Sequence, residues 1–487
     1  MTVCAPTRRR PSFLEPQLPN NPVQAYGHWL ATTPDDWPEA ARHSAWRELI
    51  DQIGVTVPGA AEPASKIAAE VVSTWGIGPS MAAGQSQRLA APWAALVNGT
   101  AGHALDFDDN FDPSKSHATT VLYPAILALA EQEGASGAAC IDAYICGLQI
   151  IGKVGQGVNP YHRDRGWHAT ATLGAVGAAA ACARLLKLDE ERAAFAVSLS
   201  TSMAAGFMSQ FGTMAKPLHA GLAAKAGIMA ASFARAGLTA GLNTLDGKNA
   251  MNHLMVGPDY EHLRDTLTNP DHGHSLTFDT DTIGEPLLIT EHAFRVKRFA
   301  NCGASHRALD GLLILREQHG FGADDVKRVD ITLPQVHVNN LMYHDPQDPL
   351  QAKFSFEYAL GTALLSGEFT LSDFTQKAVM RPQVRALYPR IHLHGIDALE
   401  GACPTEVKIT LTDGTVYETV RAMPLGSKTA PFSDEQYWAK FDSCAAPYMD
   451  AASLNGLKDA LVNFTTLEDI TMMTRHLAQP LKHRETS

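Results

Sequence analysis

The stretch from residue 103 to residue 117 carries a high density of side chains that could do chemistry. It reads HALDFDDNFDPSKSH, with a histidine at each end and carboxylate or amide side chains between them. A calcium loop would need glycine at its sixth position and a carboxylate at its twelfth. Counted from Asp106, these positions hold Phe111 and His117. A transition-metal site could use His103, His117 and a carboxylate, but no helix-spaced histidine pair supports it. On spacing alone, aspartates that cap a helix end in a surface loop fit better than a metal site.

A second candidate is His168, which lies immediately before an alanine-rich stretch. The positive end of a helix dipole disfavours the cationic form of a histidine at a helix start, so we expect His168 to be neutral. A neutral imidazole suits a general base or a hydrogen-bond donor. A structural histidine that caps a turn is the commoner explanation of such a segment taken alone.

Two further segments concentrate positive charge in a chain whose formal net charge is −12. Lys216 precedes a proline that suits the first turn of a helix, and a lysine beside helix N-terminal amides makes an anion site. The segment 295–306 adds Lys297, Arg298 and the thiol of Cys302, which again indicates carboxylate or phosphate capture. A solvated lysine and a solvated basic turn are the alternatives, and Cys302 is either a nucleophile or a buried, inert thiol.

Helices must position most of these groups, because the first half of the chain is a succession of alanine-rich stretches. Some of these stretches end at a glycine or begin after an acidic cap. So many small residues predict closely packed helix axes. The predicted helices are residues 121–132 before Gly134, 175–188, 193–205 after the cap Asp189, and 218–236 before Gly237.

The pattern changes after residues 269–285, where proline, histidine, glycine and acidic residues indicate a linker. Apolar residues then alternate as they do in strands, and Asp413-Gly414 predicts a hairpin turn. The predicted strands are 326–333, 407–411 and 415–421, and the predicted helices are 307–318, 354–365 and segments of the tail 432–477.

The predicted fold is mostly α, with a large all-helical domain that is discontinuous in sequence and a smaller α+β lid domain. A chain of 487 residues is too long for one simple core. The expected boundaries are a flexible N-terminal tail at 1–20, the helical domain at 21–275, the lid at 286–425, and C-terminal helices at 430–487 that return to the helical domain.

Composition narrows the possible functions. The acidic balance argues against a nucleic-acid partner, although a small anionic substrate needs only a few local cations. The seven cysteines are scattered without a C-x-x-C pair, which favours a reducing, cytoplasmic compartment over a disulfide framework or a zinc ribbon. The most apolar run, 173–188, is interrupted by two cations and is too short to cross a membrane, so no membrane association is expected.

Taken together, these segments resemble the MmgE/PrpD family over about residues 25–470. The family pattern is roughly N-G-x-x-x-H-x-x-D-F-D-D, H-P-x-x-x-x-x-P-A, G-x-H-x-T, G-T-M-x-K-P-L-H-A-G and K-x-Y/F-x-x-C/H. The matching segments are Asn98-Gly99 with His103 and Asp106–Asp109, His117 with Pro124-Ala125, Gly166–Thr170, Gly212–Gly221 and Lys297–Cys302. Later matches are Ala352–Ser355 and Pro424–Ser427.

The family includes 2-methylcitrate dehydratase, cis-aconitate decarboxylase and iminodisuccinate epimerase. The resemblance implies a homodimer, a cleft between a helical domain and a smaller lid, a small polycarboxylate substrate, and neither a metal nor an organic cofactor. It also implies site residues that carry over by motif, which are Asp106, Asn110, His117, His168, Lys216 and Lys297. Two further substrate-binding candidates, Cys302 and His337, replace residues that are frequent in the family.

The reactions of this family share one physical problem, which is negative charge developing on a carbon next to a carboxylate. Neutral imidazoles of His117 and His168 would serve as acid or base, and Asp106 would orient one of them. Cations fixed in a dry cleft would stabilise the developing charge. The candidate cations are Lys216, Lys297 and Arg298.

Three positions depart from the decarboxylase pattern. Asn110 stands where decarboxylases tend to have threonine, Cys302 where histidine is common, and His337 where the lid often has tyrosine. The resemblance therefore leaves open a lyase that dehydrates or decarboxylates and an epimerase of an amino- or imino-dicarboxylate. A non-catalytic carboxylate-binding protein and a metal-dependent hydrolase are alternatives from other classes.

Overall fold

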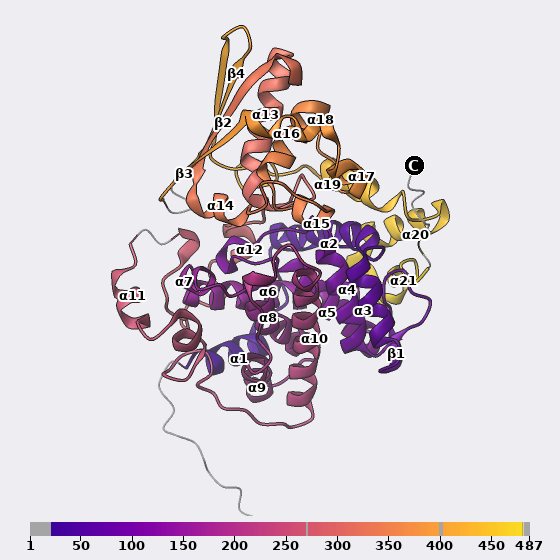
Figure 1. The fold of residues 1–487 in the computed structure, drawn as a ribbon. Helices are drawn as coiled ribbons and strands as arrows, with labels where there is room; N and C mark the ends of the chain where they lie inside the picture. Colours follow the sequence, from indigo (N-terminus) through magenta and orange to yellow (C-terminus); the bar gives the residue numbers. More distant parts are fainter. Residues whose placement is uncertain (1–20, 269–270, 399–402, 480, 482–487) are drawn as a thin grey trace, which may run out of the picture.

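The computed structural model describes residues 21–268, 271–398, 403–479 and 481. The flexible tail predicted for residues 1–20 lies outside the described residues. Two main hydrophobic cores organise the described chain, one mostly helical and one built on a small sheet. Figure 1 shows the sheet-containing body, which we call the lid, seated on the larger helical body. The mostly α fold with a smaller α+β part is thus confirmed.

The larger body begins with helices and a short strand. Their bounds are α1 (Pro22–Thr32), α2 (Glu39–Gly59), α3 (Pro63–Val72), β1 (Ile77–Ser80), α4 (Ala91–Ala104), α5 (Thr119–Glu133), α6 (Gly137–Val158), α7 (Tyr161–Asp164), α8 (Ala169–Leu185), α9 (Glu190–Thr201), α10 (Ala215–Arg235), α11 (Tyr260–Thr266) and α12 (Leu288–Glu291).

Helix ends in this body lie where local sequence predicts them. Asp189 caps α9, and its carboxylate accepts a hydrogen bond from the Arg192 N–H at 2.9 Å. Gly134 ends α5 in a left-handed conformation, which costs glycine little. The four helices predicted in the first half of the chain are confirmed as α5, α8, α9 and α10, with ends shifted by a few residues.

Helices α4 and α10 cross at a contact that depends on glycine. A Cβ atom placed on Gly221 would lie 2.1 Å from the carbonyl oxygen of Leu96, closer than any side chain could be accommodated. This approach confirms the closely packed axes predicted from the small residues. Because α4 carries His103 in its last turn and α10 carries Lys216 in its first, the crossing sets the spacing between these two groups.

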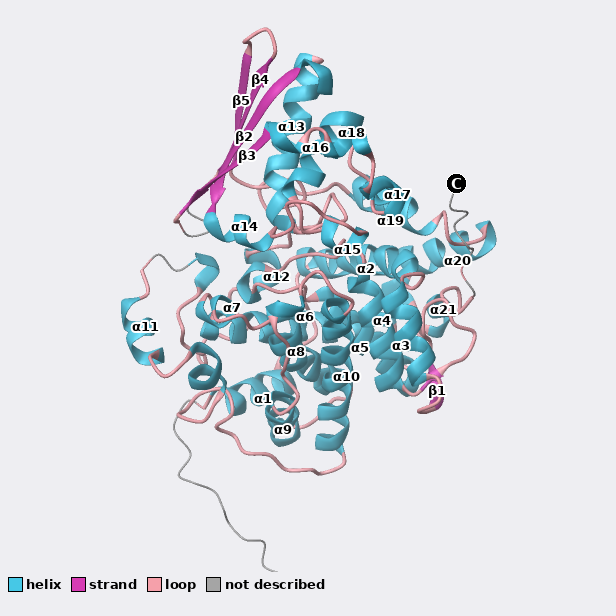
Figure 2. Ribbon diagram, viewed as in Figure 1, coloured by secondary structure: helices cyan, strands magenta, loops and turns pink. Residues whose placement is uncertain are grey.

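The lid is built from a mixed sheet and the helices that cover it (Figure 2). Its elements are α13 (His306–His319), β2 (Val326–Pro334), α14 (Gln335–Asn340), α15 (Pro349–Ala352), α16 (Phe356–Ser366), α17 (Gln376–Val379), α18 (Pro382–Arg385), β3 (Ile391–Ile396), β4 (Thr405–Leu411) and β5 (Val416–Arg421). The strand order is β3-β2-β4-β5, with β2 parallel to β3 and antiparallel to β4.

The alternating pattern in the lid strands follows from one-sided burial. Val407 and Ile409 of β4 are buried, whereas Glu406 and Lys408 between and before them are exposed. The predicted strands are confirmed as β2, β4 and β5, and the predicted helices as α13 and α16. Strand β3 was not predicted.

The chain returns to the larger body after the sheet. Helices α19 (Asp434–Ala445), α20 (Ala451–Val462) and α21 (Thr471–Thr474), coloured yellow in Figure 1, contribute to the helical core. Phe441 of α19 packs onto Gly54 of α2, and the indole N–H of Trp46 donates to the carbonyl of Leu461 at 2.7 Å.

Within the described residues, α6 is long and apolar enough to cross a membrane by length and composition alone. However, 83% of its most apolar window is buried inside the protein. Such burial is typical of a helix at the centre of a core.

Candidate active site

The chain turns sharply after α4, at Asp106. Leu105 caps the helix, and Asp106 adopts a left-handed conformation with φ 52°, which aspartate tolerates better than most residues. The turn directs the following chain into the protein, so that Asp106, Asp108 and Asp109 are at most 3% exposed. The interpretation of these aspartates as caps in a surface loop is therefore wrong.

Asp106 holds two lysines. The Nζ atoms of Lys216 and Lys297 each lie 2.8 Å from its Oδ1 atom. The ammonium of Lys216 also lies 5.2 Å from the ring centre of Phe211 and 5.0 Å from that of Phe354. Burial opposes ionisation of Asp106, but the two ammonium groups outweigh burial and hold its pKa well below the ordinary value. Asp106 is thus a carboxylate that keeps two cations in place.

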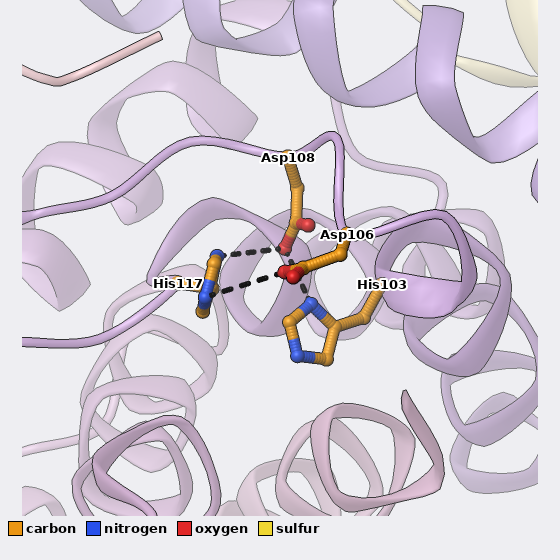
Figure 3. A group of neighbouring side chains, drawn as sticks. All are labelled: His103, Asp106, Asp108 and His117. Atoms are coloured by element: carbon orange, nitrogen blue, oxygen red, sulfur yellow. Dashed lines mark hydrogen bonds and ion pairs between the residues drawn. The ribbon is translucent and has the colours of Figure 1, made fainter. Parts of the chain in front are cut away.

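Two histidines share Asp108 (Figure 3). Its Oδ2 atom accepts a hydrogen bond from Nδ1 of His103 at 2.8 Å and lies 3.3 Å from Nδ1 of His117. The Nε2 atom of His117 lies farther from Asp106, 3.8 Å from its Oδ1. We expected Asp106 to orient a histidine, but the geometry gives this role to Asp108.

The imidazoles in this cluster favour their neutral forms. Burial lowers the pKa of His117, Asp108 opposes this effect, and Lys297 adds to it. Burial lowers the pKa of His103 to about 4. Burial also opposes ionisation of Asp108, but attraction to the two rings outweighs it and holds its pKa well below the ordinary value. The result is a carboxylate that orients neutral imidazoles.

His168 is the N-cap residue of α8, as its place in the sequence predicts. Its Nδ1 atom lies 3.1 Å from Nδ1 of His219, so one of the two rings donates and the other accepts. The pKa of His168 lies well below its ordinary value, because the ring is buried and because His103 and Lys216 lie nearby. The expected neutral form agrees with this direction, with burial as the largest cause.

One cavity of about 90 Å³ is lined by Asp106 with its two lysines, His117 and His168. It is lined from both bodies, since α8 and α10 belong to the larger body and His337 lies on α14 of the lid. Its lining includes all but one of the predicted site residues: Asp106, Asn110, His117, His168, Lys216, Lys297, Cys302 and His337.

Three of these lining residues occupy the positions that depart from the decarboxylase pattern. The backbone of Asn110 pairs with that of Arg295 through bonds of 3.0 and 2.9 Å. Burial raises the pKa of the Cys302 thiol, and the charge of Asp106 raises it further, which disfavours a thiolate. Nδ1 of His337 lies 3.2 Å from Nη2 of Arg307.

Arg298 does not line this cavity. Its guanidinium is half exposed and lies 3.0 Å from the carboxylate of Asp310. Lys297, its neighbour, is 2% exposed. The two consecutive side chains therefore point to opposite sides, and only Lys297 can act in the cavity described here.

The cavity is also lined by polar residues that were not predicted as site residues. Lys115 and Arg295 lie inside the segments 103–117 and 295–306, so their charge was a usable signal. Arg163, on the short helix α7, carried no such signal. The additional polar lining residues are Asp112, Lys115, Arg163, Thr170, Arg295 and Asn340.

Among the described residues, one group could offer several ligands to a metal ion. Donor atoms of His103, Asp106, Asp108 and His117 lie within 4.8 Å of one another. However, two ammonium groups lie 2.8 Å from the Asp106 oxygen, and they would repel a cation bound there. The donor set therefore fits acid–base chemistry on an anion better than metal binding.

Comparisons with known proteins identify the family of this chain. The model of the MmgE/PrpD N-terminal domain matches residues 27–263, and that of the MmgE/PrpD C-terminal domain matches residues 299–461. A cis-aconitate decarboxylase from Mus musculus is 28% identical over 415 residues, covering 82% of this chain and 81% of the relative. One from Homo sapiens is 28% identical over 410 residues, covering 81% and 80%. One from Aspergillus terreus is 27% identical over 486 residues, covering 93% and 95%. The chain therefore belongs to the MmgE/PrpD family, as an enzyme of the lyase type.

Proposed function

We propose that this lyase acts on a small di- or tricarboxylic acid and forms an enolate-like species next to a carboxylate. The first candidate reaction is decarboxylation of an unsaturated tricarboxylate of the cis-aconitate type. The observation that carries the proposal is the pair of ammonium groups on one oxygen of Asp106, beside an imidazole that Asp108 orients. The names of the relatives support the choice of decarboxylation as the first candidate.

The substrate would bind through its carboxylates to cations of the cavity. Lys216 and Lys297 are held by Asp106, line a small cavity and are at most 5% exposed. Ammonium groups fixed in such a space interact strongly with an anion because little water screens them. Arg163 and Arg295 line the same cavity and supply further cations for a second or third carboxylate.

The chemical step would break the C–C bond to one carboxylate and release carbon dioxide. The bonding electron pair moves into the adjacent unsaturated carboxylate, and the charge spreads onto oxygens near Lys216 and Lys297. A protonated imidazole then delivers one proton to carbon, which completes the balance. His117 suits this role because Asp108 holds its Nδ1 side and leaves Nε2 for the substrate. The negative charges of a bound substrate oppose the nearby lysines and favour protonation of this ring.

The test incubates the protein with candidate acids in deuterated water and follows proton NMR spectra and carbon dioxide release. The candidate acids are cis-aconitate, citrate, 2-methylcitrate and amino- or imino-dicarboxylates. Decarboxylation gives carbon dioxide and a deuterated product, whereas dehydration of a hydroxy acid gives a new alkene signal without carbon dioxide. Exchange of a carbon-bound proton without either product would indicate an epimerase. Binding without any of these changes would leave a carboxylate-binding protein.

Variants connect the reaction to the site. Lys216→Ala should lower kcat/KM by about 10²-fold, the scale expected when one charge-stabilising group is lost. His168→Gln should abolish turnover without unfolding the protein. Lys225→Ala, on the same helix but beside Trp93, is the matched control and should behave as wild type. Near-wild-type turnover of Lys216→Ala would overturn the role of this lysine as a carboxylate clamp.

A further inference from the structure

Three consecutive carbonyl groups of the turn after α4 each accept a hydrogen bond from a different buried lysine. Lys353 donates to the carbonyl of Leu105. Lys297 donates to that of Asp106 at 2.8 Å, and Lys440 donates to that of Phe107 at 2.8 Å. We call residues 105–107 the catalytic turn. Carbonyls after the last turn of a helix lack intrahelical partners and carry the negative end of its dipole, so cations are suited to them.

The three lysines come from parts of the chain that are far apart in sequence. Lys353 follows α15 in the lid, Lys297 lies where the chain enters the lid, and Lys440 lies on α19 of the C-terminal return. The catalytic turn itself follows α4 of the larger body. Its geometry therefore depends on three separate packing arrangements.

Lys353 is buried among backbone acceptors, an aromatic ring and the charge of Glu62. It is 3% exposed, and burial lowers its pKa to about 8. Its ammonium donates to the Leu105 carbonyl and, at 3.5 Å, to that of Ala300, and it lies 4.9 Å from the ring centre of Phe374. A buried ammonium is unfavourable unless its donors are satisfied, so backbone acceptors are central to the place of this lysine in the fold.

Lys440 contacts the same turn from helix α19 of the C-terminal return. It is 8% exposed, lies 2.7 Å from Oδ1 of Asp51, and stands 4.1 Å from the ring centre of Phe107. Its ammonium thus fixes both the carbonyl and the ring of Phe107. The two lysines thus bind the catalytic turn on either side of Asp106, Lys353 at Leu105 and Lys440 at Phe107.

These two lysine–carbonyl hydrogen bonds are important because the backbone at Asp106 is left-handed. A small rotation at Leu105 or Phe107 would displace the Asp106 carboxylate, which is the shared acceptor of Lys216 and Lys297. Displacements of about 1 Å can cost about 10²-fold in rate. We propose that Lys353 and Lys440 are positioning residues that fix the catalytic turn and, through Asp106, the two substrate-binding ammonium groups. Because Lys353 lies in the lid, this contact also couples lid placement to the site.

The proposal rests on the proposed function only for its kinetic consequence, and its structural consequence can be measured without a substrate. The variants are Lys353→Met and Lys440→Met, which keep a long apolar side chain but lose the ammonium. Lys353→Arg and Lys440→Arg keep the positive charge but change the geometry of its donors. Lys153→Met is the control, because Lys153 is equally buried but pairs with Asp279 at 2.5 Å, away from the turn.

The first measurement is amide hydrogen exchange by mass spectrometry. In both Met variants, exchange in peptides that cover residues 105–111 should accelerate by about tenfold, the effect of losing one charge-assisted hydrogen bond, while peptides from α6 stay unchanged. Lys153→Met should leave the 105–111 region as in wild type. If a Met variant does not fold, the matching Arg variant replaces it and should also accelerate exchange in the 105–111 peptides, since a guanidinium cannot reproduce the ammonium geometry. Exchange as in wild type in that Arg variant would then overturn the proposal.

The second measurement is a double-mutant cycle on the best substrate of the NMR screen. Each Met variant should lower kcat by about 10- to 100-fold, and this loss should largely disappear when Asp106→Asn is already present, because the lysines act through that carboxylate. Unchanged local exchange in Lys353→Met and Lys440→Met would overturn the proposal. So would kinetic losses that add fully to that of Asp106→Asn. If no substrate is turned over, the proposed function fails, while the exchange result still decides whether the lysines fix the turn.

Discussion

Asp108 is the residue on which the acid–base geometry depends most directly. Replacing it with asparagine keeps its shape but removes the charge that lies 3.3 Å from Nδ1 of His117. We expect kcat of Asp108→Asn to fall by about 10²- to 10³-fold with little change in KM, because general acid–base catalysis contributes at this scale. Loss of the charge also lowers the pKa of His117 further, so the decline of kcat should begin at lower pH than in wild type if His117 is the proton donor.

The adjacent Asp109 provides the control for this prediction. It is equally buried, but burial and the charge of Asp108 raise its pKa well above the ordinary value, so asparagine resembles its protonated form. Steady-state kinetics of Asp109→Asn should match wild type within a few-fold. A similar loss of activity in both variants would show that the charge of Asp108 has no special role.

Individual site residues differ in how far sequence could identify them. Asp106, His117, Lys216 and Lys297 were predicted because their motifs match in order and spacing. The role of Asp108 was not, because the left-handed turn at Asp106 decides which carboxylate meets the imidazole. Arg298 was placed incorrectly in the cavity, since a run of cations does not reveal that consecutive side chains point to opposite sides.

At the scale of elements, the crossing of α4 and α10 should not tolerate a side chain at Gly221. Gly221→Ala would place a Cβ atom 2.1 Å from a backbone carbonyl of α4, and neither helix can shift without moving Lys216 relative to His103. We expect a loss of about 1–3 kcal/mol in the free energy of unfolding, the usual cost of overpacking, together with reduced kcat. Urea unfolding and steady-state kinetics measure both effects.

Gly241→Ala is the matched control for the crossing. A Cβ atom there meets no heavy atom within 4 Å, and the backbone does not require glycine. Its free energy of unfolding should stay within about 0.5 kcal/mol of wild type, as for most surface substitutions. Equal stability of the two variants would contradict the importance of the crossing.

Helices and strands were predicted well where interactions within one element decide its ends or its buried face. The cap at Asp189 and the terminal glycine at Gly134 act within one helix, and the alternation along β4 reflects one buried face. Strand β3 escaped prediction because its apolar alternation covers only Ile391 to His394 and is followed by a glycine, and because its last three residues are exposed at the edge of the sheet. Its pairing with β2 is set by the tertiary fold.

For the whole molecule, buried neutral histidines predict sensitivity to acid. Burial lowers the pKa of His162 and of His306 to about 3. Below about pH 6.5 the unfolded chain therefore takes up protons that the folded chain does not, so stability falls as pH decreases toward the folded pKa. Between pH 7 and pH 5 each ring should remove about 2 kcal/mol from the free energy of unfolding.

Urea unfolding at the two pH values measures this effect, and variants assign it. His162→Asn should reduce the pH dependence by about 2 kcal/mol, whereas His262→Asn, at an exposed position on α11, should leave it unchanged. A pH dependence that is identical in wild type and His162→Asn would contradict the assignment to this ring.

We expect the C-terminal return to be the last part of the larger body to fold during synthesis. Because residues 432–477 complete the core that α1 to α10 begin, the larger body has an unfilled apolar face until the last helices leave the ribosome. The buried residues of the lid core lie within residues 299–409, so they are synthesised before the C-terminal return. Lys440 reaches the turn at Asp106 only at the end of this process, so the nascent enzyme acquires its assembled site last, and a chain truncated before residue 432 would expose the apolar surface of α2 to aggregation.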